Sequence, residues 1–112
     1  MGGVGMSGFI QVTTTTEKKE QAEAIADIVI KKRLAACVQI IGPISSKYRW
    51  KGKTEEKEEW LLLMKTRETL YTPLEEEIIQ LHPYEVPEIL ATKILIGSQE
   101  YMEWLEDETS AH

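Results

Sequence analysis

The segment LHPYEVPEI, residues 81–89, contains the single histidine in the interior of this sequence. His82 is followed closely by Tyr84, Glu85 and Glu88, which bring a phenol and two carboxylates near an imidazole. An imidazole with carboxylates can bind a metal ion, and the same groups can exchange protons as a general acid and base. The spacing is specific to neither chemistry, so both are hypotheses.

The same segment also has a purely structural interpretation. Pro83 ends a helix, because proline cannot donate the backbone hydrogen bond that the helix needs. Pro87 favours extended backbone at Val86, so the two carboxylates of the segment do not share one helix face. His82 then occupies the last helical turn, where it suits the negative end of the helix dipole. The sequence therefore predicts a rigid corner between a helix and a strand, with or without a binding role.

No other arrangement in the sequence points to catalysis. There is no Ser/His/acid or Cys/His set, no HExxH or CxxC motif and no glycine-rich phosphate loop. Cys37, the single cysteine, lies in an apolar stretch and is expected to be a small buried side chain. It cannot form a disulfide within the chain, which favours a reducing cytoplasm. We therefore expect a protein that is not an enzyme.

Length and charge exclude further classes. The 112 residues suffice for one domain, expected over residues 8–112 after a flexible leader at residues 1–7. The net charge of −6 is unevenly divided: residues 1–67 carry 12 basic and 8 acidic side chains, and residues 68–112 carry 1 basic and 11 acidic. An acidic half repels nucleic acid, and no apolar run reaches the roughly 18 residues of a membrane helix. Neither nucleic acid nor membrane is expected as a partner.

Hydrophobic periodicity predicts the order strand, helix, strand, strand, helix, strand, helix. The elements are expected at residues 9–14, 17–33, 35–50, 59–66, 72–82, 88–96 and after Ser98. Two βαβ-like halves joined by a hairpin form the split βαβ, or ferredoxin-like, sheet, here with an added C-terminal helix. The fold class is therefore α+β, with both main helices on one face and the apolar strand 59–66 in the middle of the sheet.

Local signals predict helix ends and one core residue. Thr14 with Glu17 is expected to form a capping box for the first helix. Thr72 is expected to cap the second helix, with Pro73 in the first turn, and an earlier start at Thr69 is the alternative. Trp104 falls on the apolar stripe of the last helix and is therefore expected in the core.

The hairpin that follows the first helix is long for a domain of this size. At about 3.3 Å per residue, its first strand must bend at Gly42–Pro43 or project beyond the body. A two-residue turn at Lys51–Gly52 would place Lys47 opposite Glu56.

Tyr48 and Trp50 share one face of this hairpin. A projecting ribbon cannot bury such aromatic side chains by itself, so it needs a partner surface. We therefore predict a homo-oligomer with this hairpin in its interface.

Four motifs of this chain resemble a known family. KRLAACVQI, YRWKGK, EEWLLLMKT and LHPYEVPEI occur in the same order and spacing as in the CutA family of divalent-cation tolerance proteins. The resemblance covers residues 9–108. It implies a ferredoxin-like fold, a tight homotrimer built through its sheets, a cytoplasmic location and a role in tolerance of copper and other divalent cations. It implies no catalytic reaction.

The family's metal ligands transfer only in part. Some members bind copper through a cysteine at the end of the first strand and through paired histidines before the PY dipeptide. Thr14 and Leu81 stand at two of those positions here, and His82 remains. One histidine is a poor copper site, because copper prefers several imidazole or thiolate ligands. We therefore expect no required cofactor and weak binding of Cu²⁺ or another divalent cation at His82.

A cleft between subunits is the second functional hypothesis, suggested by the resemblance and by polar groups beside apolar strands. A positive Lys65 near buried carboxylates would form the kind of charge cluster found at binding sites. The alternative function is therefore a regulatory trimer, similar in architecture to PII signalling proteins, that binds a small effector between subunits. The expected cleft residues are Tyr48, Trp50, Glu59, Lys65, His82, Tyr84, Glu85 and Glu88.

Overall fold

The structure is a computed structural model that describes residues 4–5 and 8–110. Its elements follow the predicted order, with two short strands added, β1 and β6, which pair with each other. They are β1 Val4–Gly5, β2 Phe9–Thr16, α1 Lys19–Lys31, β3 Cys37–Trp50, β4 Lys53–Arg67, a 3₁₀ turn Glu68–Leu70, α2 Tyr71–Leu81, β5 Ile89–Lys93, β6 Ile96–Gly97 and α3 Gln99–Glu108.

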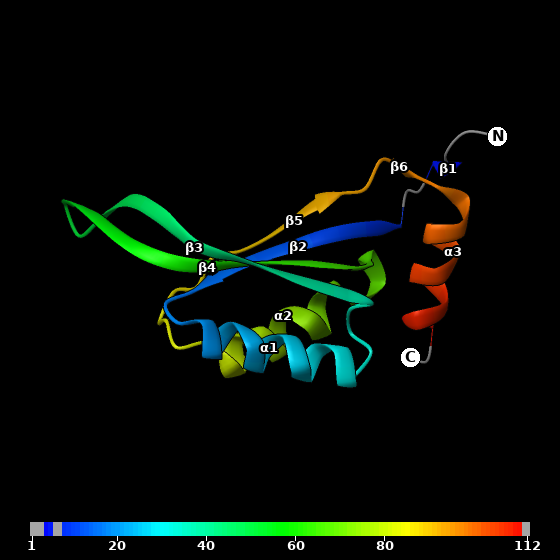
Figure 1. The fold of residues 1–112 in the computed structure, drawn as a ribbon, viewed down its shortest axis with the longest axis horizontal. Coiled ribbons are helices and arrows are strands. Elements are labelled where there is room, and N and C mark those ends of the chain that lie inside the picture. The colour runs from blue at the N-terminus through cyan, green and yellow to red at the C-terminus, as the bar shows by residue number, and fades with distance from the viewer. Residues whose placement is uncertain (1–3, 6–7, 111–112) are drawn as a thin grey trace.

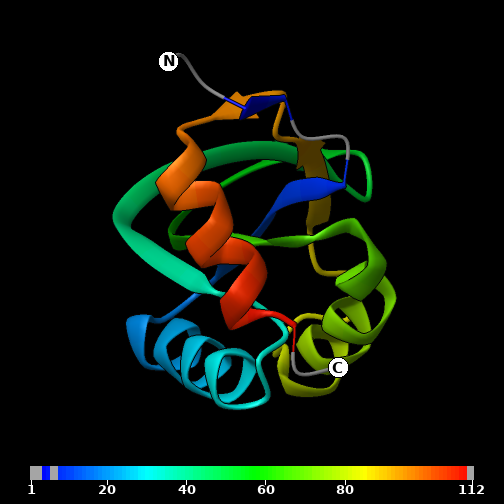
Figure 2. The same ribbon diagram turned by 90° about the vertical axis from the view of Figure 1, so that its right-hand side faces the viewer.

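Four strands form one antiparallel sheet in the order β3-β4-β2-β5. Helices α1 and α2 lie side by side on one face of this sheet, and α3 crosses its end (Figures 1 and 2). The predicted α+β, split βαβ class is confirmed, and so is the internal position of β4. Most of the predicted leader lies outside the described residues, but Val4 and Gly5 pair with Gly97 and Ile96.

The core lies between the sheet and the two main helices. Alternate residues of β4, among them Leu62 and Met64, are fully buried on the helix side. Their partners in the core come from α1 and α2, for example Ile25 and Ile78. Helices α1 and α2 leave the opposite face of the sheet uncovered, and α3 packs only at its end, against Phe9 (Figure 1). We call this the open face; its apolar residues include Ile41, Leu61, Leu63 and Leu90.

Both predicted N-caps are wrong. Thr14 remains in β2, and α1 begins two residues later than expected, after Lys18, whose backbone N–H donates to Gln21 Oε1 at 2.9 Å. Thr14 stays in the strand and does not cap the helix, because it pairs with both Leu62 and Ile89. Helix α2 begins earlier than Thr72, because the 3₁₀ turn leads directly into it.

The last strand and helix also differ from expectation. The strand predicted over residues 88–96 divides into β5 and β6, because the backbone leaves β2 after Ile94, whose N–H donates to Phe9 O at 2.9 Å. Ser98 precedes α3 as predicted. Trp104 is not in the core: it is 42% exposed, because α3 buries Met102 and Leu105 against Phe9 instead.

The β3–β4 hairpin has the predicted geometry. The register shifts between Ile41 and Ile44, which places a bulge at Gly42–Pro43. Lys51 and Gly52 have φ angles of 51° and 80°, the positive values that a two-residue hairpin turn requires. The ion pair between Lys47 and Glu56 forms at 3.4 Å. The hairpin projects well beyond the helices (Figure 1).

Thr14 carries a buried hydroxyl that has no hydrogen-bond partner among the described residues. Thr14→Val should therefore raise the free energy of unfolding by about 1 kcal/mol, because the cost of burying an unpaired hydroxyl disappears. Thr66→Val is the matched control, since the Thr66 hydroxyl donates to Leu34 O at 2.7 Å, and it should be destabilising. Denaturant unfolding at fixed protein concentration measures both changes. A loss of stability in Thr14→Val would contradict the prediction.

Candidate functional site

His82 is the C-cap residue that follows α2, and it is hydrogen-bonded to two neighbouring segments. Its Nε2 lies 2.7 Å from Thr15 O at the end of β2, and the Tyr84 backbone N–H donates to its Nδ1 at 3.1 Å. Because Nδ1 accepts a hydrogen bond, the proton of the neutral ring must be on Nε2, which donates to Thr15 O. The corner predicted at this segment is therefore held across the sheet as well as by its prolines.

Burial lowers the pKa of His82 below its ordinary value, and the Thr15 carbonyl and Glu59 oppose this shift more weakly. Because the folded-state pKa is the lower one, the unfolded chain binds this proton more tightly. Stability should therefore decrease as the pH falls below about 6.5, the ordinary value for histidine. His82→Gln should make this loss of stability at low pH smaller. The free energy of unfolding, measured from pH 8 to pH 5, tests this. An unchanged pH profile in the variant would rule out His82 as its source.

Tyr84 makes the second polar contact of this corner. Its hydroxyl donates to Glu59 Oε2 at 2.7 Å, and Glu59 is only 6% exposed. Burial and the Glu59 carboxylate together raise the pKa of Tyr84 well above its usual range. The rings of Tyr84 and His82 lie 4.9 Å apart. A buried carboxylate, a neutral phenol and a neutral imidazole thus form one cluster beside the base of the hairpin.

Lys57 joins this cluster and was not among the predicted site residues. Its Nζ lies 4.2 Å from the centre of the Tyr84 ring and 5.8 Å from the centre of the Tyr48 ring. Such contacts between a cation and an aromatic ring are attractive. The place of Lys57 could have been inferred from the predicted hairpin turn. That turn puts Lys57 opposite Ser46, on the same face of the hairpin as Glu59 and Tyr48.

The predicted cleft residues therefore divide into separate groups within one protomer. Tyr48, Glu59, His82 and Tyr84 lie together around Lys57. Lys65 is at the other end of β4, where its Nζ donates to Gln39 Oε1 at 2.6 Å. Trp50 is near the hairpin tip, and Glu85 and Glu88 are exposed. A single cleft containing all eight residues would need contributions from more than one protomer.

The residues of one protomer do not fit a preformed divalent-metal site. The described part of the chain has no group of three or more His, Cys, Asp or Glu side chains placed to hold a metal ion. Both ring nitrogens of His82 already take part in hydrogen bonds. Cys37 pairs with Lys65 in the sheet and so lies away from His82. His112 is outside the described residues. A cation at His82 would have to displace one of its two hydrogen bonds.

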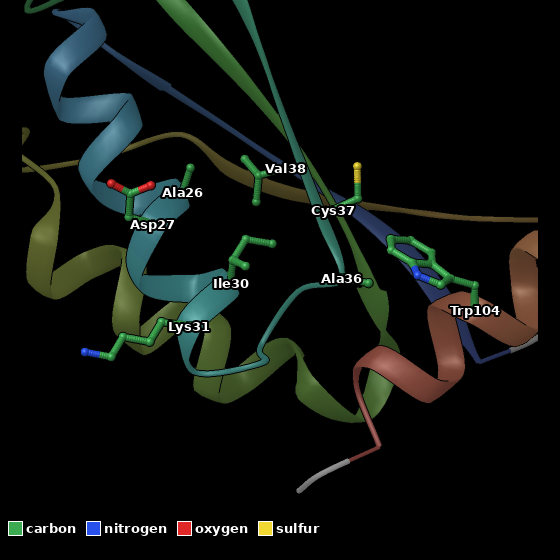
Figure 3. A pocket seen from close by; sticks show the side chains of 8 residues that line it. All are labelled: Ala26, Asp27, Ile30, Lys31, Ala36, Cys37, Val38 and Trp104. Carbon is green, nitrogen blue, oxygen red and sulfur yellow. The ribbon is translucent and has the colours of Figure 1, made fainter.

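A shallow groove of about 520 Å³ lies between α1, the start of β3 and α3 (Figure 3). Its apolar lining includes Ile30, Val38 and Trp104, with Cys37 beside the indole. Cys37 is half-buried rather than fully buried. Burial and the nearby Cys37 raise the pKa of Tyr101. The groove offers an apolar surface and no arrangement of catalytic groups.

The fold and the corner define a ferredoxin-like protein whose polar residues stabilise a helix-to-strand connection beside a long hairpin. The sequence profile of the family described as "CutA1 divalent ion tolerance protein" matches residues 10–108. The "Divalent-cation tolerance protein CutA" of Thermus thermophilus is 44% identical over 98 residues, which cover 88% of this chain and 95% of that protein. The "Protein CutA, chloroplastic" of Arabidopsis thaliana is 41% identical over 89% of this chain and 55% of its own length.

A solved structure agrees with these sequence matches. The crystal structure of CutA1 from Oryza sativa superposes with a TM-score of 0.90 at 40% identity and covers 94% of this chain and 96% of that chain. This chain belongs to the CutA1 divalent ion tolerance family. The family and the Thermus thermophilus relative are named for divalent-cation tolerance and not as enzymes. None of the helices in the described part of the chain has the length and apolar character that a membrane span requires.

Proposed function

We propose that this protein is a homotrimeric, non-enzymatic divalent-cation tolerance protein of the cytoplasm that binds copper or another divalent cation weakly. Family membership supports the tolerance role. The open face of the sheet is the observation that supports the assembly most directly. A sheet in a water-soluble domain usually covers an apolar face with another layer, and the two main helices here cover one face only.

The open face carries neighbouring apolar side chains. Ile41 is 47% exposed and pairs with Leu61 on the next strand. Leu90, on β5, is also exposed on this face. Contiguous exposed apolar surface of this kind marks an interface between proteins. Three copies that pack these faces together would bury them and bring the hairpins beside neighbouring subunits.

Light scattering tests the assembly. Purified protein at micromolar concentration should have three times the 12.8 kDa mass of one chain. A measured mass of one chain would contradict the proposed trimer.

Weak cation binding is consistent with the scattered carboxylates of residues 68–112, which attract cations without forming one site. Because both His82 nitrogens are engaged, His82→Ala should bind Cu²⁺ with an affinity within about threefold of the parent. Calorimetric titration of both proteins with Cu²⁺ measures this. A loss of more than about tenfold in the variant would instead assign the metal to His82. No copper binding in the parent would contradict the cation role itself.

A small effector is the second candidate, supported by the cluster of Lys57, Tyr84, Glu59 and His82. This cluster places the ammonium group of Lys57 beside hydrogen-bonding side chains. It lies near the surface that other subunits would cover. A thermal-shift screen with nucleotides tests this function. Stabilisation that persists in Lys57→Ala would place the effector elsewhere.

A further inference from the structure

We propose that the position held by the ammonium group of Lys57, beside the rings of Tyr48 and Tyr84, is a binding site for a small quaternary ammonium ion. Lys57 is then a tethered occupant that the ligand replaces. This inference goes beyond the functions proposed above. A nucleotide would pair with Lys57, whereas a quaternary ammonium would take its place, so removal of Lys57 should change the affinities for the two ligands in opposite directions.

Two aromatic rings lie beside one ammonium group at this position. Lys57 Nζ is 4.2 Å from the centre of the Tyr84 ring and 5.8 Å from the centre of the Tyr48 ring. A cation within about 6 Å of a ring centre is attracted by the negative face of the ring. Tyr48 comes from β3 and Tyr84 from the corner that follows α2, so folding creates this position.

The negative charge near this position comes from Glu59 and Glu17. Glu59 is only 6% exposed and accepts a hydrogen bond from the Tyr84 hydroxyl at 2.7 Å. Burial raises the pKa of Tyr84, and Glu59 and Glu17 raise it further, so both carboxylates lie near its hydroxyl. Within the described residues, neither carboxylate forms an ion pair. A buried carboxylate without a paired cation is costly, which favours a cation at this position.

The surroundings of Lys57 Nζ favour a quaternary ammonium over a primary one. A lysine ammonium has three N–H donors and is strongly hydrated. In the described part of the chain, Lys57 Nζ contacts the two rings and forms neither a side-chain hydrogen bond nor an ion pair. The protein therefore offers this cation aromatic rings and no acceptors. A quaternary ammonium has no N–H donor to leave without an acceptor, so it loses less when it leaves water for the same rings.

The Tyr84 ring is held in place, and the Lys57 side chain is not. The Tyr84 backbone N–H donates to His82 Nδ1 at 3.1 Å, and its hydroxyl donates to Glu59 at the other end of the ring. A ring that is already fixed loses little conformational freedom when a cation binds. Lys57 has a flexible four-carbon stem, and only attraction to the rings holds its ammonium group. A competing cation therefore displaces it without breaking a hydrogen bond.

NMR of ¹³C-labelled tyrosine rings tests the site, with tetramethylammonium chloride as the probe. The chain has four tyrosines, which report separately on the site and on the rest of the fold. At constant ionic strength, the resonances of Tyr48 and Tyr84 should shift to saturation in Lys57→Gln. Tyr71 and Tyr101 are the internal controls and should not shift. Ammonium chloride should bind about tenfold more weakly than the probe. Equal shifts of all four rings, or equal affinity for both salts, would overturn the site.

A comparison of variants tests whether Lys57 is the occupant. A group on a short tether has an effective concentration in the millimolar range, so Lys57→Gln should lower the dissociation constant of tetramethylammonium by about tenfold from the parent's value. Adding Tyr48→Leu should raise it again by about tenfold, because one ring is lost. Lys47→Gln is the matched control: it removes the same charge from the same hairpin, but Lys47 pairs with Glu56 at 3.4 Å. The control should keep the parent's affinity.

Three results would overturn the proposal. The first is the absence of a saturable shift of Tyr84 in Lys57→Gln. The second is an equal gain of affinity in Lys47→Gln and Lys57→Gln, which would assign the gain to net charge alone. The third is an unchanged affinity when Tyr48→Leu is added. None of these results bears on the trimer, which light scattering tests, or on a nucleotide effector, which needs Lys57 in place.

Discussion

Replacing Ile41 by glutamate should convert the proposed trimer into monomers at micromolar concentration. Ile41 lies on the open face beside Leu61, where the proposed assembly would bury it. A carboxylate that is buried without a partner costs about 3–5 kcal/mol. Since each 1.4 kcal/mol is a factor of about ten, every subunit contact should weaken by about 100-fold or more. Light scattering across a dilution series would show the change in mass.

Ile79→Glu is the matched control for this experiment. Ile79 is an isoleucine on α2 with 54% exposure, close to the 47% of Ile41, but it lies on the helical layer. The control should keep the parent's mass. Equal masses for Ile41→Glu and the parent would show that the open face is not the interface.

Replacing Tyr84 by phenylalanine should lower the free energy of unfolding by about 2 kcal/mol. The change removes the hydroxyl that donates to the buried Glu59, and a hydrogen bond to a charged group is worth more than one between neutral groups. Tyr71→Phe is the matched control, because Tyr71 donates to Glu75 at 2.8 Å and Glu75 remains partly open to water. The control should lose less than about 1 kcal/mol. Similar losses in both variants would show that the burial of Glu59 contributes little.

Tyr84→Phe should also change how the free energy of unfolding depends on pH in the alkaline range. The folded-state pKa of Tyr84 is raised above its ordinary value of 10.0, first by burial and then by Glu59. The unfolded chain therefore loses this proton first, and stability should decrease as the pH rises above 10. Tyr84→Phe should show a shallower decrease than the parent between pH 9 and pH 11. A slope equal to the parent's would assign the alkaline loss to other groups, such as Tyr71 and Tyr101.

The features that were predicted correctly depend on residues close together in the sequence. The turn at Lys51–Gly52 fixes the pairing of Lys47 with Glu56 through hairpin geometry alone. The order of strands and helices follows from periodicity within each segment. Local information of this kind was enough for the fold class and for the family resemblance.

The failed predictions depend on long-range contacts. Thr14 has the chemistry of a helix cap, but its pairing with two neighbouring strands keeps it in β2. Trp104 has the apolar character of a core residue, but α3 meets the sheet through Met102 and Leu105. The prediction of a metal at His82 is a separate case, because the sequence patterns behind it give no sign that Thr15, 67 residues away, accepts a hydrogen bond from His82. Such contacts exist only once the sheet has formed.

The bulge at Gly42–Pro43 determines to which face of the sheet each later side chain of β3 points. Three steps along β3, from Ile41 to Ile44, match only two steps along β4, from Leu61 to Glu59. Odd-numbered residues of β3 therefore point to the open face before the bulge, and even-numbered residues do so after it. Removing one residue here would rotate every later side chain to the opposite side. Insertions and deletions in this hairpin should consequently be tolerated in pairs and not singly.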